Sequence, residues 1–289
     1  DRRQRQMCIR DRVSTLANVG AITGCGDGTF QPSKAISRAE FVTILAGIYG
    51  VNISKGMPFS DVGHGWCYDA VATAYANGWV SGYTDGTFGP SRSMTRAEAA
   101  AIFARLLAEK NGDTISTVAN TRFTDIPAHA WYSGYAKYLN NNGVTYGKSK
   151  TIFAPDDAIT RAEFTTLAVR FFDVYGDGDA EIMEQFSGFN DVSSGYWAAE
   201  YIKYAALHGW INGYGDGSFH ADREINRAEV VTIVNRLLGR EADEDYIADN
   251  LRKLNTFPDV SRKHWAYYAV MEAANAHTAV LGESESWSK

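Results

Sequence analysis

The sequence predicts a mostly α-helical protein built from tandem helix-turn-helix repeats. Three observations support this prediction. A four-residue block that ends in Arg-Ala-Glu occurs four times, apolar residues at helical spacing follow each block, and Gly-rich turns precede the blocks. The period is roughly 65 residues, which is longer than the usual range of about 20–50 but still indicates stacked supersecondary units.

The first half of each repeat begins with Phe-x-Asp and Val or Ile, and a Trp follows. The four copies begin at Phe59, Phe123, Phe189 and Phe257, and their tryptophans are Trp66, Trp131, Trp197 and Trp265. A run of small and apolar residues then indicates a helix, which ends at a Gly in three copies: Gly78, Gly143 and Gly209. Because an indole brings a large apolar area, we expect the tryptophans to be core anchors.

The second half of each repeat opens with a turn. Asp-Gly, a strong turn dipeptide, occurs in three copies: Gly24–Phe30, Gly82–Phe88 and Gly213–Phe219. The remaining copy, Tyr146–Phe153, lacks Asp-Gly, so we expect its turn to be built differently.

An amphipathic helix is predicted after each turn, because apolar residues recur three and four positions apart, as Leu106 follows Phe103 and Ile102. Its start has the pattern of a capping box, in which an N-cap side chain and a Glu three residues later bond each other's backbone amides. The predicted structural caps are Thr95 with Glu98, Thr160 with Glu163, and Asn226 with Glu229; Ser37 and Glu40 repeat the pattern.

These boundaries divide the chain into complete and partial repeats. Residues 59–110, 123–175 and 189–240 are predicted complete repeats, 13–50 a second half alone, and 257–289 a first half alone. Polar linkers are expected near 111–121 and 240–256. Residues 1–12 are rich in Arg, lack periodicity and resemble a translated adapter, so we treat them as a non-native leader.

The order of these motifs resembles the S-layer homology module of bacterial cell-surface proteins over roughly residues 13–277. The resemblance implies a pseudo-threefold helical spindle whose grooves bind secondary cell-wall polysaccharide attached to peptidoglycan, a polymer that commonly carries pyruvate ketals. It also implies an extracellular location in the cell wall or S-layer, a non-catalytic anchoring role, and further domains outside this chain.

The Arg of each block lies in the first helical turn, where a cation opposes the helix dipole. Two interpretations remain open. The Arg is a bidentate clamp on a ligand carboxylate, or it forms a structural ion pair with an Asp of a neighbouring half-repeat. The aspartates considered are Asp61, Asp125, Asp191 and Asp259.

The resemblance favours contact with the wall polymer at Arg96, Arg161 and Arg227. Arg38 carries the same motif, but its repeat lacks a complete first half. Aromatic residues at the turns are candidates for stacking on sugars, and these are Tyr83, Tyr146 and Tyr214; Cys25 takes their place in the first copy.

Other functions are disfavoured. The net charge of −6 argues against nucleic-acid binding, and no apolar run is long enough for membrane insertion. The sequence has no Gly-x-Ser-x-Gly or His-Glu-x-x-His motif, so we expect no enzyme activity, cofactor or metal. Asp173–Glu184 comes nearest to a calcium loop, but Tyr175 occupies a ligand position. The alternative function is a structural helical-repeat scaffold for protein–protein interaction, in which the arginines are internal ion pairs.

Overall fold

The computed structural model describes residues 24–25, 27–49, 56–116, 118–175, 188–237, 239–275, 277–281 and 285–288. These ranges contain nine α-helices, one 3₁₀ helix and two short strands, which confirms the mostly α class. Within the same ranges, none of the helices has the length and apolarity needed to cross a membrane. The chain forms two compact units. The first comprises Asp1–Asn77, Ser81–Arg92 and Asn226–Lys289, and the second Gly78–Val80 and Ser93–Ile225.

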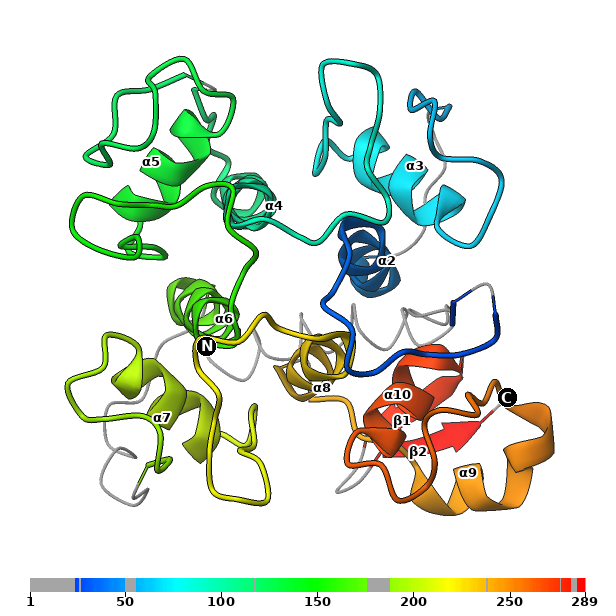
Figure 1. The fold of residues 1–289 in the computed structure, drawn as a ribbon. Coiled ribbons are helices and arrows are strands. Elements are labelled where there is room, and N and C mark those ends of the chain that lie inside the picture. Colours follow the sequence, from blue (N-terminus) through cyan, green and yellow to red (C-terminus); the bar gives the residue numbers. More distant parts are fainter. Residues whose placement is uncertain are drawn as a thin grey trace. The chain divides into compact units, whose positions relative to one another are not determined.

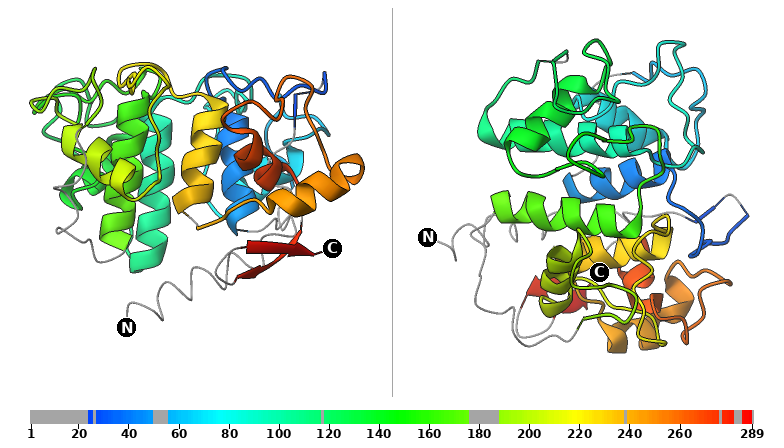
Figure 2. Two further views of the ribbon diagram at one scale, coloured as in Figure 1. Left: turned by 90° about the horizontal axis from the view of Figure 1, so that it is seen from below. Right: turned by 60° about the vertical axis from the view of Figure 1, so that its left-hand side comes forward.

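The first unit is built on two helix pairs, in which α2 packs on α3 and α8 packs on α10 (Figure 1). An antiparallel hairpin follows α10 and lies toward the carboxyl-terminal end of α8, away from the turns (Figure 2). The elements are α2 (Arg38–Tyr49), α3 (Tyr68–Ala76), α8 (Arg227–Leu237), α9 (Glu244–Asn250), η2 (Leu251–Lys253), α10 (Tyr267–Ala274), β1 (Thr278–Leu281) and β2 (Glu285–Ser288).

The second unit repeats the same pairing. Helix α4 packs on α5, α6 packs on α7, and α4 also contacts α6 (Figure 1). The elements are α4 (Arg96–Asn111), α5 (Ser133–Asn141), α6 (Arg161–Tyr175) and α7 (Ala199–Leu207). The predicted Gly stops of the short helices are confirmed, since Gly78, Gly143 and Gly209 take φ values of 72°, 74° and 69° just beyond the helix ends.

Phenylalanine, and not the Trp that follows Phe-x-Asp, anchors the core of each repeat. The Phe of Phe-x-Asp meets the Phe that ends the turn, and the ring centroids are 5.3–5.4 Å apart in Phe30–Phe257, Phe59–Phe88, Phe123–Phe153 and Phe189–Phe219. The first Gly of each turn permits this contact. A Cβ on Gly82 would lie 2.2 Å from the Phe59 ring, and one on Gly213 would lie 2.4 Å from Phe189.

The Asp of Phe-x-Asp ties the two halves of a repeat together through backbone amides. Asp61 accepts hydrogen bonds from the amides of Phe88 and Gly89, both at 2.7 Å. Asp125 and Asp191 do the same in the second and third repeats. These carboxylates thus serve the turns, and Arg96 and Arg227 pair with glutamates and not with these aspartates.

The two ends of the chain supply one composite repeat. Asp259 accepts hydrogen bonds from the amides of Phe30 at 2.8 Å and Gln31 at 2.6 Å, and Phe257 packs on Phe30. The carboxyl-terminal half-repeat thus completes the turn before α2. The two segments were predicted as separate partial repeats from their motifs, because a contact between residues more than two hundred positions apart leaves no local pattern in the sequence.

Other expectations change or stay open. The polar segment 240–256 contains α9, whose N-cap Asp243 accepts from the amide of Tyr246. Residues 1–12, and Asp177–Glu184 of the calcium alternative, lie outside the described residues. The pseudo-threefold spindle remains a prediction.

We predict that Asp259→Ala destabilises the composite repeat by about 2 kcal/mol, because two amides lose a charged acceptor. Hydrogen exchange at Phe30 and Gln31 should accelerate, and the Tm should fall. Asp249→Asn on the exposed face of α9 is the matched control and should change neither quantity. Unchanged exchange in Asp259→Ala would show that the half-repeats do not depend on this contact.

Candidate functional site

Each Arg-Ala-Glu block begins a long helix with reciprocal capping hydrogen bonds. The Glu98 carboxylate accepts from the amide of Thr95 at 3.1 Å, and the Glu98 amide donates to the Thr95 hydroxyl at 3.3 Å. The same pair of bonds occurs in the other three blocks: Ser37 with Glu40, Thr160 with Glu163 and Asn226 with Glu229. The caps satisfy helix amides and hold the Glu side chains in fixed positions.

The helix start also docks on the turn of a neighbouring repeat, which follows along the chain for Arg38, Arg96 and Arg161 and belongs to the composite repeat for Arg227. The backbone amides of the four arginines donate to turn carbonyls at 2.8–3.0 Å, in the pairs Arg38 to Arg92, Arg96 to Asp157, Arg161 to Arg223 and Arg227 to Lys34. A helix amide that would lack a partner is therefore bonded to the neighbouring repeat.

The guanidinium groups lie over the Phe ring of that same turn. The distances from Cζ to the ring centroid are 4.7 Å for Arg38 over Phe88, 5.1 Å for Arg96 over Phe153, 4.3 Å for Arg161 over Phe219 and 4.6 Å for Arg227 over Phe30. All four arginines are 3–6% exposed. Cation–π attraction is strongest when the pair is removed from water, as here.

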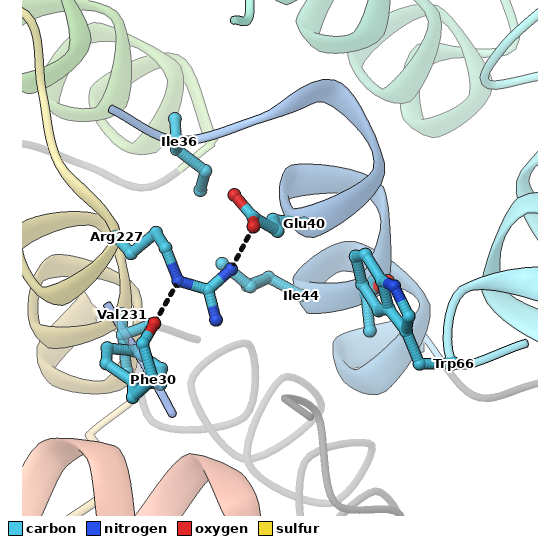
Figure 3. Close-up of a pocket in the computed structure, with 8 residues that line it drawn as sticks. Phe30, Ile36, Glu40, Ile44, Trp66, Arg227 and Val231 are labelled. Carbon is cyan, nitrogen blue, oxygen red and sulfur yellow. Dashed lines mark hydrogen bonds and ion pairs between the residues drawn. The ribbon is translucent and has the colours of Figure 1, made fainter. Parts of the chain in front are cut away.

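Two of these arginines form buried ion pairs with the capping Glu of the long helix that follows the contacted turn. Arg96 Nη1 lies 2.8 Å from Glu163 Oε1, and its Nε donates to the carbonyl of Phe153 at 2.7 Å. Arg227 pairs in the same way with Glu40 and the carbonyl of Phe30 (Figure 3). Ion pairing was one of the two interpretations of the Arg, but the acid is the capping Glu and not an Asp.

A small cavity of about 10 Å³, room for roughly one water, lies beside the Arg227 pair. In Figure 3, Arg227 and Glu40 point toward each other above Phe30, while Trp66 lies on the other side of Ile44. The buried pair and the exposed indole thus border the same hollow of the first unit.

The predicted burial of the four tryptophans is wrong. Their exposed fractions are 42%, 44%, 43% and 55% for Trp66, Trp131, Trp197 and Trp265. Each precedes its helix in the loop after the Asp, while the paired phenylalanines fill the core. The regular spacing of these tryptophans located them in the sequence, but period alone does not distinguish a core position from a repeated surface position.

The turn tyrosines fall into two kinds. Tyr83 and Tyr214 directly follow the close-packed Gly, and each ring lies between a buried and an exposed Arg. For Tyr83 the Cζ-to-centroid distances are 5.1 Å to Arg38 and 4.9 Å to Arg92; for Tyr214 they are 5.3 Å to Arg161 and 5.1 Å to Arg223. Arg38 thus has the same contacts to a turn as Arg161, because the turn that it meets belongs to the following repeat.

Tyr146 is not equivalent to these tyrosines. It precedes Gly147, and Lys148 takes the position of Tyr83, with its amide bonded to the carbonyl of Ile152. Tyr146 is 48% exposed and lies 4.3 Å from the Arg170 guanidinium. The missing Asp-Gly predicted a different turn, and indeed the hydroxyl of Ser149, not an Asp, accepts the turn amides.

The Asp-Gly turns are held by their own side chains. Hydrogen bonds from the Thr87 hydroxyl and amide lower the pKa of Asp85, and those from Ser218 lower the pKa of Asp216. Both carboxylates therefore accept hydrogen bonds that stabilise their own turns. In the described part of the chain, no His, Cys, Asp and Glu side chains form a group of three suited to a metal ion.

We predict that Arg96→Met lowers the free energy of unfolding by about 3–5 kcal/mol, because Glu163 is left as a buried charge without its cation. Lys148→Met is the matched control, since it removes the exposed ion pair with Asp157 in the same unit and should cost about 1 kcal/mol or less. Urea denaturation followed by circular dichroism measures both. Equal effects of the two variants would contradict a buried, linking role for Arg96.

Comparison with known proteins places these repeats in a family. The S-layer homology domain model matches residues 9–42, 58–100, 122–165 and 188–231, which together make up more than half of the chain. The matches coincide with the motif-bearing repeats, and each ends in the long helix that follows a block.

Three relatives come from Acetivibrio thermocellus. Cell surface glycoprotein 1 is 34% identical over 215 residues, 72% of this chain and 9% of the relative. The Cellulosome-anchoring protein is 32% identical over 209 residues, 71% of this chain and 44% of the relative. Exoglucanase XynX is 30% identical over 232 residues, 80% of this chain and 20% of the relative. This chain thus spans less than half of each relative, and it belongs to the S-layer homology domain family.

Proposed function

We propose that the chain anchors its protein to the bacterial cell surface by non-catalytic binding of secondary cell-wall polysaccharide. The family membership and the names of two relatives, a cell surface glycoprotein and a cellulosome-anchoring protein, support the anchoring role. The relative named as an exoglucanase shows that such repeats also occur in enzymes, so the anchor is proposed as a module separate from any catalytic function.

The observation that carries the proposal is the exposure of one Trp at the same place in every repeat. In four equivalent loops a large apolar side chain is left 42–55% exposed, although its burial would favour folding. Tyr and Trp are enriched at interfaces, where one end of the side chain is apolar and the other meets water. An indole offers a flat apolar face to a sugar ring and an N–H to its hydroxyl groups.

In this proposal the block arginines and the turn tyrosines contribute to the same grooves. The ligand-binding set is Arg38, Arg96, Arg161, Arg227, Tyr83, Tyr146 and Tyr214. A guanidinium has five N–H donors, and in Arg96 two of its nitrogens hold the carbonyl of Phe153 and Glu163, so we assign a ligand carboxylate to its other N–H groups. Because that Glu already balances the charge of Arg96 and of Arg227, we expect each such contact to add modest affinity.

Several repeats on one polymer would bind through avidity. When one groove holds the polymer, the neighbouring grooves bind it at a high effective concentration. Weak individual sites can therefore anchor a protein stably.

We predict that combining Trp66→Ala, Trp131→Ala, Trp197→Ala and Trp265→Ala reduces cosedimentation with purified cell-wall sacculi at least tenfold. The helical circular dichroism and Tm should change little, because the indoles lie outside the core. Leu251→Ala on η2 is the control, since it truncates another exposed apolar side chain in the carboxyl-terminal region.

Full retention of the quadruple variant on sacculi would overturn the role of the tryptophans.

The buried ion pairs favour the alternative, a helical-repeat scaffold for another surface protein. In that case Arg96→Lys, Arg161→Lys and Arg227→Lys together would lower the Tm and leave sacculus binding unchanged at temperatures where the variant is folded.

A further inference from the structure

The third repeat has an open cavity whose lining includes none of the block arginines or turn tyrosines of the proposed ligand-binding set. Its volume is about 400 Å³, within the range of small-molecule clefts. The cavity lies between the loop that follows Phe189 and the turn that follows Phe219. Its lining residues are Asp191, Tyr196, His220, Ala221, Asp222 and Arg223.

Two of the lining side chains distinguish this repeat. Where the third repeat has Tyr196 and His220, the first has Gly65 and Gly89, the second has Ala130 and Ala154, and the composite repeat has His264 and Gln31. The polar wall of the cavity is therefore not required by the repeat fold, which forms with glycine or alanine at both positions. Ala221 also stands where these repeats have a proline.

Hydrogen bonds fix the acidic side of the cavity. The Tyr196 hydroxyl donates to Asp222 Oδ1 at 2.7 Å. Burial and this bond raise the pKa of Tyr196, so its phenol remains a protonated donor. Both oxygens of Asp191 accept amide hydrogen bonds from the turn. Asp222 is exposed and held in one orientation by Tyr196.

Tyr214 holds the donor side. The His220 ring lies 4.7 Å from the Tyr214 ring, and the Arg223 guanidinium both lies over that ring and donates to its hydroxyl. Imidazole and guanidinium groups are thus positioned at the cavity next to two carboxylates. His220 Nδ1 is 3.9 Å from Asp191 Oδ2, and its Nε2 is 3.1 Å from the Ser218 hydroxyl.

The charges decide which ligand class fits. Two carboxylates and one guanidinium give the cavity no excess of positive charge, so an anionic ligand gains little there. A neutral sugar suits the site, because its hydroxyl groups can donate to Asp222 and accept from Arg223 and His220. Clefts with a few convergent polar groups typically bind small ligands in one orientation.

We propose that this cavity is a subsite for a neutral hexose, specific to the third repeat. The inference rests on the proposed function, because it assigns one sugar of the bound polysaccharide to Asp222, His220 and Arg223. The subsite binds through hydroxyl groups and differs in this from the arginine grooves, to which we assign carboxylates.

The test titrates the intact chain with single sugars and follows amide resonances by NMR. The neutral probes are the methyl glycosides of mannose, galactose and N-acetylglucosamine, and the acidic probes are glucuronate and galacturonate. We expect at least one neutral probe to shift the resonances of Tyr196, Asp222 and Arg223 saturably, and acidic probes to do so at least tenfold more weakly.

Two variants separate binding from folding. Asp222→Asn should weaken the affinity for the neutral probe about tenfold. Asp156→Asn, at the equivalent position of the second repeat, should leave this affinity unchanged. His220→Gly should also weaken binding without lowering the Tm, because His220 has a φ of 54°, a value that glycine adopts without strain.

Preference for the acidic probes, the absence of saturable shifts, or equal effects of Asp222→Asn and Asp156→Asn would each overturn the inference. Its failure is distinguishable from that of the proposed function. If the chain binds sacculi but no hexose shifts the resonances of the cavity, only the subsite is refuted. If a hexose shifts these resonances but the chain does not bind sacculi, the anchoring role is refuted and the sugar site stands.

Discussion

The structure depends on one repeated interaction, the docking of each Arg-Ala-Glu helix start on the turn of a neighbouring repeat. The Arg amide bonds a turn carbonyl, and its guanidinium covers the turn Phe. At Arg96 and Arg227 the charge meets the capping Glu of the long helix that follows the contacted turn. One three-residue motif thus begins a helix and links two repeats. This explains a cation at a helix start, where the dipole alone disfavours it.

This linkage leaves other residues available for binding. Paired phenylalanines pack in the core, and the Asp of each first half accepts hydrogen bonds from turn amides. The loops between them carry an exposed Trp and, in two turns, a Tyr between two arginines. The repeat therefore combines a rigid interior with side chains that can vary, as Tyr196 and His220 do in the third repeat.

Local patterns in the sequence predicted the helices, their Gly stops and the deviant turn at 146–153. They failed where the deciding contact is distant. The spacing of Trp66 and its equivalents is the same whether an indole is buried or exposed. The sequence also does not indicate that Phe59 and Phe88, and not Trp66, occupy the core of the repeat. Likewise, Arg227 and Glu40, or Asp259 and Phe30, meet only because the chain folds back on itself. Each Arg contacts the turn of a repeat other than its own, and the sequence of a single repeat does not predict this contact.

The central claim is that the repeats recognise a secondary wall polymer and not peptidoglycan itself. The most direct measurement is cosedimentation of the intact chain with sacculi before and after chemical removal of that polymer. We predict that binding is lost when the polymer is stripped and is competed by the released polymer in solution. Undiminished binding to stripped sacculi, with no competition by the released polymer, would contradict the claim.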